Sequence, residues 1–277
     1  MWFPFAVLSA VFYSMLWILA RMSKGLPSSV VTGVQFIYGP ILLWIASRYV
    51  DFPWGETWWW AYLTLPFCIV PAYAWAMTYA LHRTQVTFLQ PLFGLSSIAT
   101  LLVASTFFGE NIPTYGIVGI LIITFGLLSL YHGRWEVWKS SGPWITLLGA
   151  FIFGANAAII GGVLQKFPHV FALSGMAITG HLLFCSIPAA PRLKQVVWSK
   201  RTIWIFIGLS IAMLGQDIAT LYALTLGPFS YVISVKRASM LITAVVGYVF
   251  LHERDQSLSR LLISSVLVLI GIVMLTV

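Results

Sequence analysis

Two adjacent cations, Lys236 and Arg237, lie inside a long apolar stretch of the sequence. If residues 227–250 form a membrane helix, Lys236 is nine residues from its start, about 14 Å along the axis. Each cation costs roughly 2.5–3.5 kcal/mol at the centre of such a helix, and charges at that depth usually serve function. Asp217 lies seven residues before the end of the preceding stretch, 202–224, so a helical hairpin would bring it to a similar depth. One carboxylate leaves one positive charge in excess, which favours binding of an anionic group.

Other polar and aromatic side chains also lie deep in apolar stretches. Amide and imidazole groups must find a hydrogen-bond partner there, which is either a ligand or a neighbouring helix. We predict contact with a substrate for Asn156, Gln90 and Gln216, and for Gln35 and His181 a bond between helices is an equal alternative. The aromatic residues proposed to form a wall of the same site are Trp17, Tyr79 and Tyr222, and for any one of them packing against other helices is the favoured alternative.

The elements that position these residues are membrane helices. Of the 277 residues, 60% are hydrophobic and 8% are charged, whereas a soluble domain has about 25% charged residues. Apolar stretches of about 17–25 residues, the length that a bilayer requires, follow one another almost without a break. The predicted spans are 3–21, 28–47, 57–81, 84–107, 113–131, 143–165, 170–188, 202–224, 227–250 and 258–276. We therefore predict an all-α membrane protein with ten transmembrane helices, lying in the lipid bilayer of the cell's inner membrane.

The two halves of the chain are related by an internal repeat. Tyr79-Ala80-Leu81 recurs 143 residues later as Tyr222-Ala223-Leu224, and the same offset relates Glu110 to Glu253. The predicted repeats are residues 1–135 and 140–277. Because each holds five spans, an odd number, they must be inverted, an architecture typical of secondary transporters with a substrate site near the midplane.

The repeat also indicates which features are scaffold. The counterparts of Lys236 and Arg237 in the first half are Phe93 and Gly94, so the cations do not belong to the common framework. Small residues four apart occur in both first spans of the repeats and allow close helix packing or leave room for a ligand. They are Ala6, Ala10 and Ser14 in the first half, and Thr146, Ala150, Gly154, Ala158 and Gly162 in the second.

Two segments resemble a known family. Gln90-Pro91-Leu92 through Phe107-Phe108-Gly109-Glu110 is similar to the fourth span of the EamA-like branch of the drug/metabolite transporter superfamily, and Ser234 through Glu253 to its ninth. The resemblance implies a ten-helix fold, transport without ATP, and a central cavity lined largely by spans 1, 3, 4, 6, 8 and 9. Gln90 and Asn156 are the preferred polar candidates because they lie in spans four and six. We interpret Glu110 and Glu253, at span ends, as helix-end or gate residues.

Loop charges give a prediction of orientation that conflicts with the resemblance. Loops after odd-numbered spans carry eleven Lys and Arg residues, counting Arg260 just inside span ten, and loops after even-numbered spans carry only Arg48 and Lys166. The positive-inside rule then places both termini outside the cytoplasm, whereas the resemblance implies cytoplasmic termini. The net charge of +8 is a topology signal in such a protein, and no nucleic-acid partner is predicted.

These observations favour a secondary active or facilitated transporter of a small anionic or zwitterionic metabolite, working by alternating access. A flippase for a lipid-linked substrate is one alternative. Another is a non-transporting membrane subunit, which predicts a closed core with the three charges mutually satisfied. Enzyme motifs such as a Walker A lysine or HExxH do not occur, and no cofactor or metal site is predicted. Small faces bearing Gly119 and Gly126 permit packing within one chain or in a homodimer.

Overall fold

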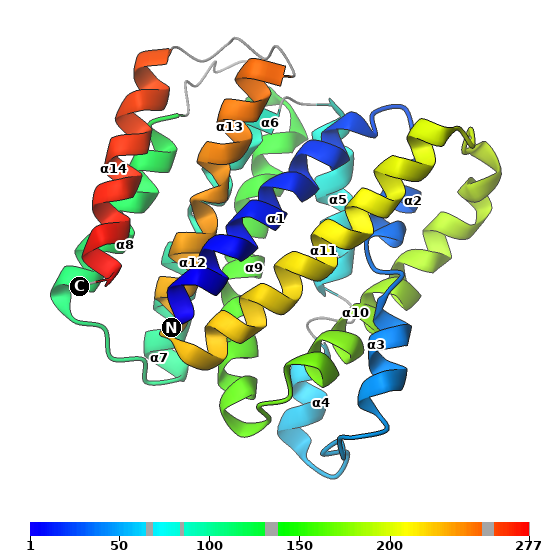
Figure 1. Ribbon diagram of the computed structural model, residues 1–277, viewed down its shortest axis with the longest axis horizontal. Helices are drawn as coiled ribbons and strands as arrows, with labels where there is room; N and C mark the ends of the chain where they lie inside the picture. The colour runs from blue at the N-terminus through cyan, green and yellow to red at the C-terminus, as the bar shows by residue number, and fades with distance from the viewer. Residues whose placement is uncertain (65–68, 84–85, 131–137, 251–257, 277) are drawn as a thin grey trace.

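The computed structural model describes residues 1–64, 69–83, 86–130, 138–250 and 258–276, and its regular elements there are helices (Figure 1). Seven segments in these ranges are long and apolar enough to cross a membrane. They are Trp2–Met22, Ser28–Ala46, Ser141–Lys166, Val170–Gln195, Lys200–Leu226, Phe229–Val249 and Ser259–Thr276. Two shorter apolar helices cover Pro91–Phe107 and Thr114–Leu128. The chain is therefore an integral, multi-pass membrane protein.

Most predicted spans correspond to a single helix. These helices are α1 (Trp2–Met22), α8 (Thr114–Leu128), α9 (Ser141–Lys166), α10 (Val170–Ala189), α11 (Lys200–Leu226) and α14 (Leu258–Thr276). A 3₁₀ segment, η3 (Ala190–Gln195), extends α10. The predicted third span is described as α4 (Thr57–Thr64) and α5 (Val70–Arg83), and residues 65–68 between them lie outside the described ranges.

Three predicted spans are interrupted, whereas the sequence predicted continuous helices. Span two is α2 (Ser28–Val34) and α3 (Gly39–Ala46), span four is α6 (Val86–Phe93) and α7 (Ser96–Phe107), and span nine is α12 (Phe229–Arg237) and α13 (Ser239–Phe250). Pro40 lies at the start of α3 and explains the first, because proline has no N–H to donate to the residue four positions earlier. Pro91 lies inside α6, three residues before Gly94. At the breaks the backbone makes tighter bonds, such as Gly94 N–H to Pro91 O at 3.1 Å and Ala238 N–H to Val235 O at 3.0 Å.

The second and third of these breaks occupy related positions in the two repeats. Leu95 lies between α6 and α7, and Ala238 lies between α12 and α13, 143 residues later. Broken helices at matching positions are a feature of inverted-repeat transporters, where they border the substrate site.

Contacts between helices follow the same two-fold pattern. Helix α1 packs on α11 and α12 of the second half, and its counterpart α9 packs on α5 and α7 of the first (Figure 1). Helix α3 packs on α10 and α8 on α14, so these two contacts join equivalent helices. The helices of each half therefore pack mainly against helices of the other half, as expected of two related repeats.

The small-residue faces are used for packing within the chain. Gly119 of α8 faces Gly271 of α14, and a Cβ on Gly119 would lie 3.1 Å from the Gly271 carbonyl oxygen. In α9, the Gly154 carbonyl accepts a hydrogen bond of 3.0 Å from Thr100 Oγ1 of α7. The faces that could have supported a homodimer are thus occupied by neighbouring helices, and dimerisation stays a prediction without this support.

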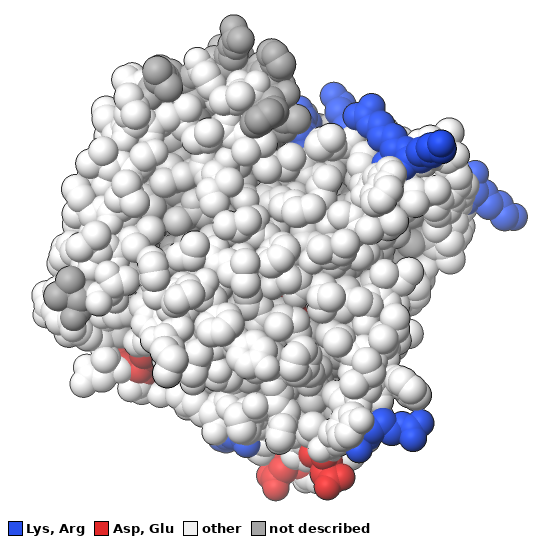
Figure 2. Space-filling model, viewed as in Figure 1, with Lys and Arg blue, Asp and Glu red and all other residues white. Residues whose placement is uncertain are grey.

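Most of the exposed cations in Figure 2 lie at one end of the bundle, whereas the opposite end carries both acidic and basic residues. Exposed Lys24, Arg192, Lys194, Lys200 and Arg201 lie at or near the ends of α1, η3 and α11. Figure 2 shows cations gathered at this end, and Figure 1 shows both termini away from it. These cations belong to the loops after spans one and seven, so their common position agrees with assigning both loops to the same side of the membrane.

Candidate functional site

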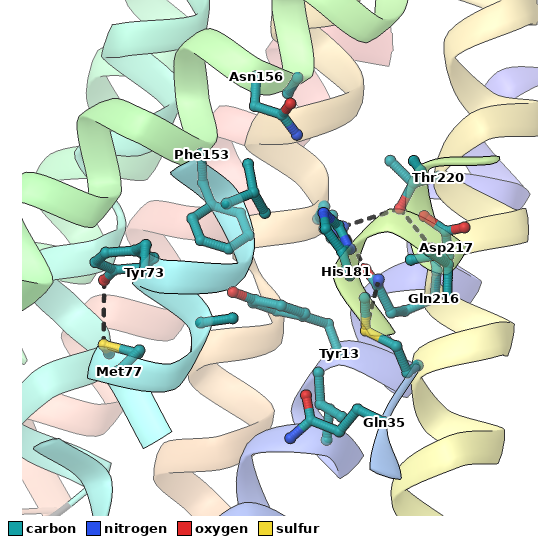
Figure 3. A pocket seen from close by; sticks show the side chains of 18 of the residues that line it. Tyr13, Gln35, Tyr73, Met77, Phe153, Asn156, His181, Gln216, Asp217 and Thr220 are labelled. Carbon is teal, nitrogen blue, oxygen red and sulfur yellow. Dashed lines mark hydrogen bonds between the residues drawn. The ribbon is translucent and has the colours of Figure 1, made fainter. Parts of the chain in front are cut away.

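The candidate site is a cavity of about 150 Å³ between the two halves of the bundle. Side chains from α1, α5, α6, α9, α10, α11 and α12 line it, together with Gln35 and Phe36 at the break between α2 and α3. The spans that the resemblance implied all contribute, and spans two and seven add to them. Figure 3 shows the Tyr13 ring extending between Tyr73 and Phe153 on one side and Gln216, Asp217 and Thr220 on the other.

Lys236 is buried in this lining and is held by neutral partners. Its Nζ donates hydrogen bonds to Gln216 Oε1 at 2.5 Å and to Thr220 Oγ1 at 2.9 Å, both on α11. The Tyr13 ring centroid lies 5.0 Å away, within range of a cation–π interaction. The residue is in the last turn of α12, where the helix dipole favours a cation.

Arg237 is more deeply buried than Lys236, and two of its donor atoms have no acceptor among the described residues. Its side chain is 2% exposed, and its guanidinium carbon lies 4.6 Å from the Phe93 ring centroid and 5.3 Å from that of Tyr13. Nε and Nη1 are buried without a hydrogen-bond acceptor among the described residues. Rings stabilise the charge but cannot replace an acceptor, so these donors are available to an anion.

Asp217 reaches the same cavity from α11 but neutralises neither cation directly. Its carboxylate accepts a short hydrogen bond from the Ser174 hydroxyl of α10. In the part of the chain that the structure describes, no ion pair joins it to Lys236 or Arg237. A cavity with unpaired charges differs from the closed, mutually satisfied core that the non-transporting alternative predicted.

Other predicted residues fall into three groups. Trp17, Asn156 and Gln216 line the cavity, as do Gln35 and His181. The Asn156 Oδ1 atom is buried without a partner among the described residues. Gln90 is in α6, but its side chain lies outside what the structure describes, and Glu253 lies wholly outside the described ranges.

The third group is the pair of repeat-related tyrosines, which do not line the cavity as predicted. Tyr79 is 39% exposed, one residue beyond the cavity residue Thr78. Tyr222 follows the cavity residue Leu221 and stacks on Phe5, with ring centroids 5.7 Å apart. Neither tyrosine is among the residues that line the cavity.

Glu110 lies in the connection after α7 and contacts the other half of the molecule. Both carboxylate oxygens lie 3.4 Å from the Ser230 backbone nitrogen, which is in the first turn of α12. A negative charge at this end of a helix is favourable. Burial raises the pKa of the Glu110 carboxyl, and the hydrogen bonds from Ser230 partly oppose this. Glu110 is thus next to the N-terminus of the helix whose other end carries Lys236 and Arg237.

Comparisons with known proteins agree with this architecture. The sequence model of the EamA-like transporter family matches twice, over residues 1–131 and 140–277. The chain belongs to the EamA-like transporter family. Members of this family are membrane transporters of small molecules rather than enzymes. A solved structure described only as "Crystal structure of protein" superposes with a TM-score of 0.73 at 16% identity, covering 99% of this chain and 96% of its own. No curated protein matches the sequence.

The site of this EamA-like transporter also contains residues that the sequence did not reveal. Tyr13 contacts both cations, yet it is one of eleven tyrosines, and its position four residues before Trp17 was the available signal. Thr220 lies four residues after Gln216 and therefore on the same helix face. Phe93 appeared only as the uncharged counterpart of Lys236, and its contact with Arg237 depends on how the two broken helices meet.

Replacing Thr220 with valine should destabilise this EamA-like protein by about 1–3 kcal/mol, because the buried ammonium group of Lys236 loses one of its two acceptors and the buried Ser9 hydroxyl loses a hydrogen-bond partner. We expect a lower thermal unfolding midpoint in detergent for Thr220→Val. Thr225→Val is the matched control, since this exposed hydroxyl of the same helix donates only to the Tyr222 carbonyl. Equal midpoints for the two variants would show that Thr220 does not hold Lys236.

Proposed function

We propose that this EamA-like protein is a secondary transporter that binds a small anionic or zwitterionic metabolite at Lys236 and Arg237 and carries it by alternating access. The observation that carries the proposal is the buried guanidinium of Arg237, whose Nε and Nη1 have no acceptor among the described residues and which lines a cavity. A buried donor without an acceptor costs about 1–3 kcal/mol, and more when it is charged. An anionic group in the cavity would remove that cost.

The placement of the charges supports a transport role over a structural one. Lys236 and Arg237 are at the end of α12, immediately before its break at Ala238. The residues around them come from both halves, with Tyr13 and Phe93 from the first and Gln216 from the second. Relative movement of the halves would change the contacts of a bound anion, as alternating access requires.

The test is uptake by proteoliposomes of labelled anionic, zwitterionic and cationic metabolites of up to about ten non-hydrogen atoms. We expect uptake of anions or zwitterions by the wild type, and a fall of at least tenfold for Lys236→Gln. Lys166→Gln is the matched control, because Lys166 is exposed outside the cavity and lies over the Trp58 ring at 5.4 Å. Uptake of cations alone, or equal rates for both variants, would contradict the proposed anion site.

A further inference from the structure

We infer that Asp217 restricts the substrate to one negative charge, so that the cavity accepts small monocarboxylates with an apolar body and rejects dianions. This inference rests on the proposed anion site and adds a specificity-determining residue to it. Three features of the cavity carry it: the number of its charges, their partners, and the aromatic character of the remaining wall.

The formal charges of the lining leave one positive charge without a counterpart. Lys236 and Arg237 are basic, Asp217 is acidic, and His181 is assigned no charge. Since no other Asp or Glu of the described chain reaches the lining, a ligand with a single negative charge makes the cavity neutral. A dianion leaves it with an excess negative charge away from water, which is unfavourable at low dielectric.

The partners of the charges show which cation is in excess. Lys236 is bonded to Gln216 and Thr220, on either side of Asp217 in α11, and it attracts the carboxylate electrostatically. Arg237 has two donors without an acceptor. We therefore propose that Arg237 binds the carboxylate of the ligand. The negative charge of Asp217 then compensates the positive charge of Lys236. A second carboxylate on the ligand would be repelled by Asp217, whose carboxylate is held by the Ser174 hydroxyl.

The rest of the wall suits an apolar body. Phe93 and Phe153 have ring centroids 5.5 Å apart, Phe153 lies 5.1 Å from Tyr73, and Trp17 lies 5.7 Å from Phe93. All four line the cavity. A cavity near 150 Å³ with apolar walls holds a molecule of about the size of benzene. A chain or ring of about six carbon atoms therefore fits beside Arg237.

Three probes of equal chain length separate the charge classes. Hexanoate has one carboxylate, adipate has two, and norleucine adds an ammonium group to the hexanoate chain. Isothermal titration of the purified, detergent-solubilised protein should show hexanoate binding at least tenfold more tightly than adipate. Norleucine has one carboxylate and an ammonium group that Asp217 does not repel, so it should also bind more tightly than adipate. In Asp217→Asn, which removes the repelling charge, the preference for hexanoate over adipate should fall at least tenfold. Asp51→Asn, at an exposed loop position, should leave that preference unchanged.

The outcomes distinguish this inference from the proposed function. If wild-type protein binds adipate as tightly as hexanoate, the restriction to one negative charge is wrong and the anion site stands. An unchanged preference in folded Asp217→Asn would also overturn the role of Asp217. If Asp217→Asn fails to fold, the wild-type ratios still decide the substrate class. Absence of binding for all three probes, together with uptake of cations alone, would remove the anion site itself.

Discussion

Arg237→Gln should lower the affinity for the transported anion by about thirtyfold or more, the largest effect expected of a single substitution in the cavity. Removing one partner of a buried, hydrogen-bonded charge pair costs about 2–5 kcal/mol, and about 1.4 kcal/mol corresponds to a factor of ten. The guanidinium is 2% exposed between the rings of Phe93 and Tyr13, so water cannot replace it as a donor. Glutamine keeps part of the apolar stem and offers only one amide donor group.

Arg237→Lys separates charge from geometry in the same measurement. An ammonium group restores the positive charge, but it cannot present the planar pair of donors that Nε and a terminal nitrogen of arginine offer to a carboxylate. We expect affinity between that of Arg237→Gln and the wild type. Affinities would be measured by titration with the best ligand from the uptake panel, after size-exclusion chromatography has shown monodisperse protein.

A control for Arg237 exists on the surface of the same chain. Arg48 is exposed, and its guanidinium carbon lies 5.1 Å from the Trp44 ring centroid, outside the cavity. Arg48→Gln removes a cation that also contacts an aromatic ring, and it should leave affinity within a factor of two. If Arg237→Gln behaves like Arg48→Gln, the cation of Arg237 has a purely structural role and the anion site must be abandoned.

The sequence identified the charged residues of the site best, because burying a charge in a membrane has a high free-energy cost. Lys236, Arg237 and Asp217 could be placed at one depth by counting residues along two predicted helices, and all three line the cavity. Counting does not determine rotation about the helix axis. Asp217 therefore appeared as a partner for the cations, whereas the structure turns it toward Ser174 on α10.

Rotation also explains the aromatic residues. Tyr79 and Tyr222 were conspicuous because they repeat, but a repeat marks a shared framework and carries no information about which side faces a cavity. Tyr13 has no counterpart that would single it out, yet it contacts both cations. Its role follows from the packing of α1 between α11 and α12, which depends on contacts distant in sequence.

The broken helices were predictable only in part. Pro40 and Pro91 are visible in the sequence, but the break at Ala238 has no proline within α12 or α13. It lies at the position equivalent to Leu95, so the internal repeat could have predicted this break from the one in the first half. The small residues of span six were visible in the sequence. Only the position of α7 shows that Gly154 serves close packing and does not leave space for a ligand.

Gly154→Ala should lower the thermal unfolding midpoint by roughly 2–10 °C, since overpacking costs about 1–3 kcal/mol. A Cβ at this position would lie 2.5 Å from the Ser96 carbonyl oxygen and 2.6 Å from the Ala99 Cβ atom. Backbone of α7 is one of these neighbours, so the two helices must separate and the hydrogen bond from Thr100 to the Gly154 carbonyl must lengthen. The larger Gly154→Leu should yield no monodisperse protein.

Gly33→Ala provides the comparison for the same chemical change in a helix. A Cβ on Gly33 would meet the Cβ atoms of Ala189 and Cys185 at 3.8 Å, an ordinary contact distance. Alanine favours a helix over glycine by about 1 kcal/mol, so this variant should be as stable as the wild type or more stable. Because α7 and α9 belong to different halves, a loss of stability specific to Gly154 would locate a tight contact between the halves. Equal midpoints for Gly154→Ala and Gly33→Ala would instead mean that the two halves meet loosely at this pair of helices.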